Sequence, residues 1–220
     1  MSTLITNYLD IIERLPAGAL LRLQNVDWDE YEHLLTQMDD HPGHRLSYDR
    51  ESLIIVSPSL EHERYKGFAQ RLIDILSEEM ELDIEPAGAT TLKSKLLKKG
   101  LEPDTCVYVQ NAAHVIGKLR LTLGVDPPPD VAVEIDMSND SIDKLPIYAA
   151  IGVPEIWRYD GKVAHFYKLA GENYEVMLES IAFPGFTVQD FGQYMERSRV
   201  KGYTAAAKAF RRMLRSRASS

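Results

Sequence analysis

The segment PPPDVAVEID, residues 127–136, constrains the fold more than any other part of the chain. Its acids, Asp130, Glu134 and Asp136, are separated by even numbers of residues. On a β-strand they therefore point to one face, while the apolar residues between them point to the other. Acids on one face of a buried-looking strand are costly unless something neutralises them. Either a divalent cation does so, since Mg²⁺ binds carboxylate and carbonyl oxygens, or the face is exposed to solvent.

A further acid stands at the start of another predicted strand. Asp104 follows Glu102-Pro103 and directly precedes the apolar run TCVYV. Proline restricts both its own φ and the residue before it, so Asp104 approaches the sheet on a rigid segment. A single Asp before a strand is often only a turn residue. Its combination with Glu134 and with Lys144, which opens a predicted helix, favours a metal site.

The composition indicates one soluble α/β domain. Of 220 residues, 45% are apolar and 26% are charged, which is enough to build a sizeable core. No run approaches the roughly 18 apolar residues of a membrane span, and the N-terminus lacks the pattern of a signal peptide. With a single cysteine, Cys106, in a core-like strand, we expect a reducing cytoplasmic location. Nucleotide-binding and zinc motifs are absent from the sequence, which argues against a nucleotide cofactor.

Charge is distributed unevenly along the chain. Eight of the 25 basic residues follow Glu196, and no acidic residue does, which leaves residues 1–196 with a charge of −16. We expect a C-terminal helix over 189–213 with Tyr203, Ala206, Ala207, Phe210 and Leu214 near one face. This basic tail either packs on the acidic body or binds an anionic partner such as DNA, and the apolar stripe favours packing.

Period and turn signals predict the remaining elements. A helix over 4–15 and a second one containing Tyr31 and Leu34 precede a hairpin around Asp49-Arg50-Glu51-Ser52. A long helix should run from an N-cap at Ser59 to about Glu81. The expected strands are 84–91, 105–109, 131–135, EIWRY, VAHFYKL and YEVML, with a helix over 141–152 and a basic break LKSKLLKKG. We divide the chain into an N-terminal extension (1–25), a main domain (26–190) and a basic helical tail (191–220).

The strings SPSLEHE, EPDTCVY, PPPDVAVEID and DKLPIYAAIGVPEIWRYD occur here in one order. Together they resemble the Uma-two family of restriction endonuclease-like proteins, within the PD-(D/E)XK nuclease superfamily. The resemblance covers about residues 28–188. It implies an α/β (α+β) fold with a restriction-endonuclease-like core, in which helices flank a central mixed β-sheet.

The resemblance also implies roles for individual residues. Asp104 and Glu134 match the acids that bind metal, with the Ile135 carbonyl as a third oxygen. The superfamily's usual Lys, two residues after the Glu, is replaced here by Asp136. Lys144, on the following helix, matches the Lys of families in which that group has moved. His62 matches the histidine of the Ser-Pro-Ser-x-x-His segment, as a contact for phosphate or metal-bound water or as a structural residue.

These expectations give two hypotheses for function. The first is a Mg²⁺-dependent endonuclease, with Mn²⁺ as an alternative ion, that hydrolyses phosphodiester bonds in DNA. The second is a nuclease-fold module that binds nucleic acid or assembles with proteins without cutting. We further expect a homodimer, with EIWRY and VAHFYKL as candidate contacts. Lys93, Lys95, Lys98 and Lys99 either follow a phosphate backbone or form a solvated strand edge. Asp130 is either a structural residue or an additional carboxylate at the metal.

Overall fold

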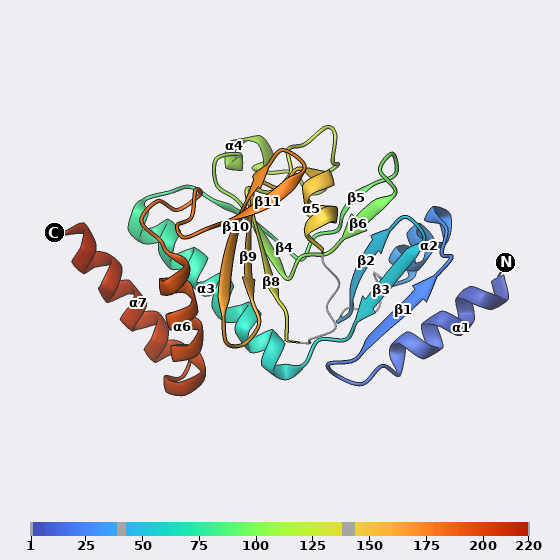
Figure 1. The fold of residues 1–220 in the computed structure, drawn as a ribbon, viewed down its shortest axis with the longest axis horizontal. Coiled ribbons are helices and arrows are strands. Elements are labelled where there is room, and N and C mark those ends of the chain that lie inside the picture. The colour runs from blue at the N-terminus through green and yellow to red at the C-terminus, as the bar shows by residue number, and fades with distance from the viewer. Residues whose placement is uncertain (1, 39–42, 138–143, 220) are drawn as a thin grey trace.

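The computed structural model describes residues 2–38, 43–137 and 144–219 (Figure 1). The helices are α1 (Ser2–Glu13), α2 (Trp28–Met38), α3 (Leu60–Met80), α4 (Ala112–Val115), α5 (Leu145–Ile151), α6 (Val188–Lys201) and α7 (Tyr203–Ala218). The strands are β1 (Leu20–Gln24), β2 (Arg45–Asp49), β3 (Ser52–Val56), β4 (Glu85–Gly88), β5 (Leu92–Ser94), β6 (Lys99–Leu101), β7 (Thr105–Tyr108), β8 (Val131–Ile135), β9 (Glu155–Tyr159), β10 (Ala164–Ala170) and β11 (Asn173–Met177). No helix of the described part is long and apolar enough to cross a membrane.

The strands form two sheets that stand side by side (Figure 1). The N-terminal sheet has the order β1-β3-β2-β6-β5, and all its pairings are antiparallel. The main sheet has the order β11-β10-β9-β8-β7-β4, in which β8 and β9 run parallel and the other neighbours antiparallel. A mixed central sheet with flanking helices confirms the predicted fold class.

Helix α3 lies against the main sheet and carries its core. Ser59 caps it by accepting a hydrogen bond from the His62 amide at 3.1 Å, and Glu81 ends it with a left-handed φ of 54°. The predicted stripe is buried: Phe68, Leu72, Ile75 and Leu76 are all 0% exposed. They belong to one apolar cluster with alternate residues of β8, Val131, Val133 and Ile135. The alternation predicted for this strand is therefore confirmed.

The other face of the main sheet carries a second apolar cluster. Ala132 of β8 packs there with Cys106 of β7, Ile156 of β9 and Tyr148 of α5. Because Glu134 alternates with Ile135, its side chain lies on this face, toward α5. Cys106 is completely buried, in agreement with its expected place in the core.

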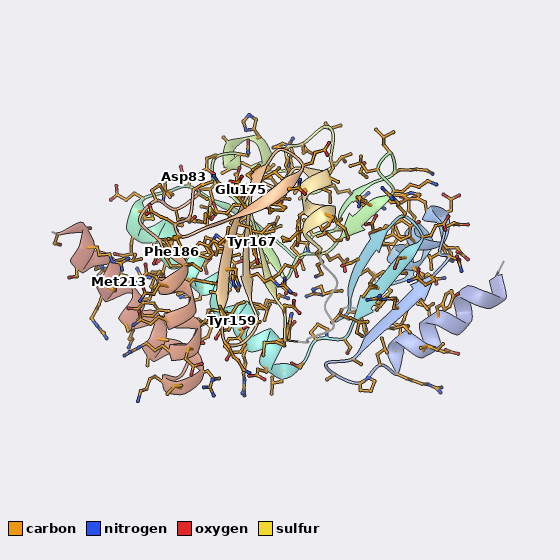
Figure 2. All side chains as sticks on the ribbon, in the orientation of Figure 1. Asp83, Tyr159, Tyr167, Glu175, Phe186 and Met213 are labelled. Carbon is orange, nitrogen blue, oxygen red and sulfur yellow. The ribbon has the colours of Figure 1, made fainter. Side chains whose placement is uncertain are left out.

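The C-terminal segment consists of two helices, so the single helix predicted over 189–213 was wrong. Gly202 adopts a φ of 86°, outside helical geometry, and separates α6 from α7. Most of the predicted apolar face packs: Ala206, Ala207 and Phe210 are buried, and Leu214 contacts the same cluster, whereas Tyr203 is 49% exposed. Figure 2 labels two side chains of this apolar region: Phe186, a buried member of the cluster, and Met213 of α7, which packs against it.

Arginines of α7 pair with acids of the body. Arg211 contacts Glu78 and Glu79 near the end of α3, and Arg215 also binds Glu79 at 2.7 Å. Arg217 binds Asp190, the residue that completes the capping box of α6, at 2.7 Å. Of the two alternatives for the tail, the structure shows packing on the acidic body. Both apolar burial and ion pairs hold it there.

One of the two candidate contacts between protomers needs correction. EIWRY forms β9, which lies between β8 and β10 and is almost entirely buried, so it cannot serve as a contact between protomers. VAHFYKL, essentially β10, is also an interior strand, but most of its side chains are only half-buried, so its role as a contact stays a prediction. The homodimer itself stays a prediction.

The basic segment forms part of the β5–β6 hairpin instead of a simple break, and its lysines face acids. Lys93 binds Glu32 at 3.0 Å, and Lys99 binds Asp49 at 2.8 Å. Strand β1, in the predicted N-terminal extension, pairs with β3. Residues 141–143, the start of the helix expected over 141–152, lie outside the described residues.

Candidate active site

A cavity of about 250 Å³ lies between the two sheets. The main sheet, α3 and α5 contribute the four polar residues predicted as catalytic, His62, Asp104, Glu134 and Lys144, and β2 of the N-terminal sheet adds Arg45 and Ser47. The N-terminal sheet and the turns next to it contribute apolar side chains on other parts of the lining, including Leu20, Ile54, Val56 and Pro58. The four side chains predicted as catalytic are thus brought to one cavity, although they come from four separate parts of the chain.

Asp104 is held by two donors. Its side chain is buried, with 2% of the residue exposed. Oδ2 accepts a hydrogen bond from the Ile135 amide at 2.7 Å, and Oδ1 lies 3.0 Å from Nε2 of His62. The Asp104 amide donates to the Val133 carbonyl at 3.2 Å. The rigid Glu-Pro-Asp approach therefore fixes the carboxylate at the junction of β7 and β8, where Ile135 also lines the cavity.

Glu134 is held on both oxygens by α5. Lys144 Nζ contacts Oε2 at 2.7 Å, and the Tyr148 hydroxyl makes a short hydrogen bond to Oε1. Lys144 precedes the first residue of α5 and Tyr148 follows four residues later, so one helical turn places both donors on the same side. A Lys supplied by this helix thus reaches the strand carboxylate, as the resemblance implied.

His62 occupies the first turn of α3 and is 7% exposed. Ser59 orients the backbone there, so that the imidazole reaches Asp104 of the main sheet. Nδ1 lies 3.4 Å from Glu63 Oε1. This geometry makes His62 the orienting partner of Asp104 and also exposes it to the cavity that it lines.

The four groups shift one another's protonation. Burial raises the pKa of Asp104, but His62, Lys144 and the Ile135 amide outweigh it and hold that pKa below its usual range. Burial also raises the pKa of Glu134, and the neighbouring Asp104 adds to this against the effect of Lys144. For His62 and Lys144, burial lowers the pKa, yet the adjacent carboxylates prevail and raise it. The site thus places two carboxyl groups, an imidazole and an ammonium group together in a poorly solvated space.

The other acids of the 127–136 segment have different surroundings. Asp136 also lines the cavity and pairs closely with Arg158 of β9. Asp130, at the opposite end of β8, accepts hydrogen bonds from the amides of Val109 and Asn111 at 2.7 and 2.8 Å. It is absent from the lining, so the structural alternative for Asp130 is the one the contacts favour.

The donor set fits a hard divalent ion that keeps part of its water shell. Among residues 2–38, 43–137 and 144–219, no three His, Cys, Asp or Glu side chains gather closely enough to enclose a metal. Two carboxylates, Asp104 and Glu134, do share the cavity with the Ile135 backbone. Mg²⁺ is usually held in this way, by one or two carboxylates together with water and substrate phosphate. Each carboxylate oxygen has one protein donor and retains a lone pair for a cation.

Sequence reasoning missed two features of the site. Tyr148 was not predicted as a site residue, but it is fully buried and its hydroxyl donates to Glu134. The sequence did contain a signal for this role: Tyr148 is four residues after Lys144, so both lie on the same side of the helix. The apolar side of the cavity was missed as well, because β1 was not predicted. The lysines of 93–99 do not appear in the lining, so that segment is not part of this site.

A family model named Uma2, described as "Putative restriction endonuclease", matches residues 28–183. A solved structure, titled as that of "a putative nuclease belonging to DUF820" from Anabaena variabilis, is similar at 15% sequence identity and a TM-score of 0.48. That match covers 68% of this chain and 90% of the other. A search of curated protein sequences returns no match. Since the family model spans well over half of the sequence, the chain belongs to the Uma2 restriction endonuclease family.

Proposed function

We propose that this protein is a Mg²⁺-dependent nuclease that hydrolyses phosphodiester bonds in DNA, with Mn²⁺ as a substitute ion. The observation that supports it best is the convergence of Asp104, Glu134 and Lys144 on one cavity. The two acids come from adjacent strands of the main sheet, and the Lys comes from the following helix. Membership of a restriction endonuclease family supports a nuclease over other metal-dependent hydrolases.

Each residue has a role that follows from its surroundings. Asp104 and Glu134, with the Ile135 carbonyl, would hold the ion. Once bound, the ion would supply Lewis acidity toward a phosphoryl oxygen and lower the pKa of a water molecule. The Lys144 ammonium, 2.7 Å from Glu134, can turn to a phosphate oxygen and offset its negative charge during attack.

The remaining groups orient this centre. His62 fixes one oxygen of Asp104, and Tyr148 fixes one oxygen of Glu134. Partners that orient metal-binding side chains commonly affect affinity by about 10–100-fold. Burial of Asp104 and Glu134 limits the water around the carboxylates and strengthens their attraction to a cation.

The test is a cleavage assay with single-stranded and duplex DNA in Mg²⁺, Mn²⁺ or EDTA. We expect metal-dependent cleavage by the unmodified chain and a loss of at least about 100-fold in Asp104→Asn. Calorimetric titration with Mn²⁺ gives a second readout, in which Asp104→Asn should lose most of its affinity.

A matched control is Asp83→Asn, the same change at an exposed acid between α3 and β4, outside the cavity lining. It should keep both activity and Mn²⁺ affinity. Failure of the unmodified chain to cleave any DNA, together with no Mn²⁺ binding, would reject the nuclease and favour a module that binds without cutting.

A further inference from the structure

We propose that the cavity receives a nucleotide from a single-stranded or locally unpaired segment of DNA, and not the backbone of an intact duplex. This inference rests on the proposed function and names the substrate class of the same site. It is carried by the burial of the reactive groups, the apolar part of the cavity and the distribution of positive charge.

The first observation is the depth of the carboxylates. Asp104 and Glu134 are only 2% and 7% exposed, and they line a space between two sheets instead of a convex surface. A phosphate must enter this space to reach both. In a duplex the phosphates are carried on a stiff rod, whereas a single strand can bend one nucleotide inward. Enzymes that act on buried nucleotides use single strands or extrude the unit from the stack.

The second observation is the apolar lining. Leu20 of β1 and Ile54 and Val56 of β3 line the same space as the carboxylates. A charged phosphate does not bind favourably to apolar side chains. An unstacked base does, because apolar side chains cover the faces that its neighbours covered in the stack. The volume of about 250 Å³ is just below the range of pockets for drug-sized ligands, and it suits one base or nucleotide.

The third observation is the scarcity of positive charge at the cavity. Within the described part of the chain, its basic lining residues are Arg45, Lys144 and Arg158. Three arginines of the basic tail, Arg211, Arg215 and Arg217, pair instead with Glu78, Glu79 and Asp190. Three lysines of the β5–β6 hairpin, Lys93, Lys95 and Lys99, pair with Glu32, Asp29 and Asp49. A duplex carries a dense row of phosphates, and tight binding to it requires many cations on one surface. Two or three cations suit a short single-stranded stretch.

The test compares three fluorescent DNAs of one sequence: a single strand, a blunt duplex and a duplex with splayed ends. Phosphorothioate versions, which resist hydrolysis, give binding by anisotropy in Mg²⁺, and unmodified versions give cleavage rates. We expect the single strand to bind at least about tenfold more tightly than the blunt duplex, and the splayed ends to be cut while the paired middle is spared. Affinity for the single strand should fall with salt by a logarithmic slope of about −2.

Val56→Trp tests the apolar lining by filling it. It should reduce affinity for the single strand about tenfold or more, while Mn²⁺ titration and the melting temperature stay near those of the unmodified chain. Val176→Trp is its matched control, since Val176 is 63% exposed on the edge strand β11. Val56→Ser, which adds no bulk, should cause a smaller loss in the same direction.

The outcomes separate this inference from the function on which it rests. Equal or tighter binding and cleavage of the blunt duplex would overturn the single-strand preference and leave the nuclease intact. A normal single-strand affinity in a folded Val56→Trp would also overturn it. A chain that neither binds nor cuts any of the three DNAs would overturn both.

Discussion

Two buried acids lie at the two ends of β8: Asp130 directly before the strand and Glu134 near its end. They differ in the groups that surround them. Asp130 is 4% exposed and Glu134 is 7% exposed. Asp130 accepts hydrogen bonds from the backbone of Val109 and from the backbone and side-chain amides of Asn111. Glu134 accepts its hydrogen bonds from side chains, Lys144 and Tyr148, and it borders a cavity.

The difference lies in whether the partners can be exchanged. The fold fixes the position of backbone amides, so the hydrogen bonds of Asp130 connect the loop after β7 to β8. These donors cannot move aside for a ligand. The ammonium of Lys144 sits on a flexible stem and can yield its place to a cation or turn to a phosphate. Burial alone therefore does not distinguish structural from functional acids, whereas the type of partner does.

The largest expected effect is at Glu134. Glu134→Gln should lower the rate of metal-dependent cleavage at least about 100-fold, because it removes one of two carboxylates for the ion. The urea midpoint should move little, because Asp104 still offsets the charge of Lys144. Measured cleavage rates and unfolding curves check this pair of outcomes, and a large loss of stability with normal cleavage would reverse our assignment.

Asp130→Ala should show the opposite pattern. Two backbone amides lose their acceptor, and an unsatisfied buried donor costs about 1–3 kcal/mol. We expect the free energy of unfolding in urea to fall by about 2–4 kcal/mol, with cleavage retained below the melting temperature. Loss of Mn²⁺ affinity in a folded Asp130→Ala would show that the two ends of β8 are not separate.

Tyr148→Phe sharpens the comparison at the cavity end. It removes the hydroxyl that holds Oε1 of Glu134 and leaves the packing of the ring in place. Mn²⁺ affinity should weaken about tenfold, as found for partners that orient metal ligands. Tyr174→Phe is the control, because its hydroxyl donates to the Val153 carbonyl instead. Equal effects of the two changes would assign Tyr148 to packing alone.

The smallest effect concerns a third acid, Asp190. Burial raises its pKa, but hydrogen bonds from Arg217 and Thr187 outweigh this and lower it. Since the folded-state pKa lies below the unfolded value of about 4, Asp190 stabilises the fold above that pH and ceases to as pH falls through its folded pKa. Arg217→Ala should lower the free energy of unfolding by less than about 1 kcal/mol at pH 7. Its effect should shrink below pH 4, and a constant effect from pH 7 to 2 would contradict this linkage.

Much of the main sheet could be predicted from local pattern. The runs 131–135 and EIWRY coincide with β8 and β9, because dense apolar and aromatic residues between Pro or Gly breaks are typical of buried strands. The hairpin β2–β3 was predicted at its turn. Strand β1 was not, because its half-buried sequence LLRLQ has no clean alternation.

Other elements depend on contacts that sequence does not display. Strand β6 is stabilised by pairing with β2 and β5, although its sequence, which begins with Lys99, resembles a solvated segment. The break at Gly202 was missed because an isolated glycine in a helical pattern is often tolerated. Within the site, the residue pattern indicated Asp104, Glu134 and Lys144 and the family resemblance strengthened that indication, whereas His62 came from the resemblance alone. The partner of Asp136, Arg158, comes from pairing of β8 with β9 and was not visible in the sequence.

Helix α3 spans the molecule from the cavity to the tail. His62 lies in its first turn and Glu79 in its last, which at 1.5 Å per residue places them about 25 Å apart on one rigid rod. The contacts of Arg211 and Arg215 are therefore remote from the chemistry of Asp104. Substitutions in the tail can change thermal stability without changing the cavity, and substitutions around the cavity can do the reverse. Stability and the proposed substrate site can thus change separately within one chain.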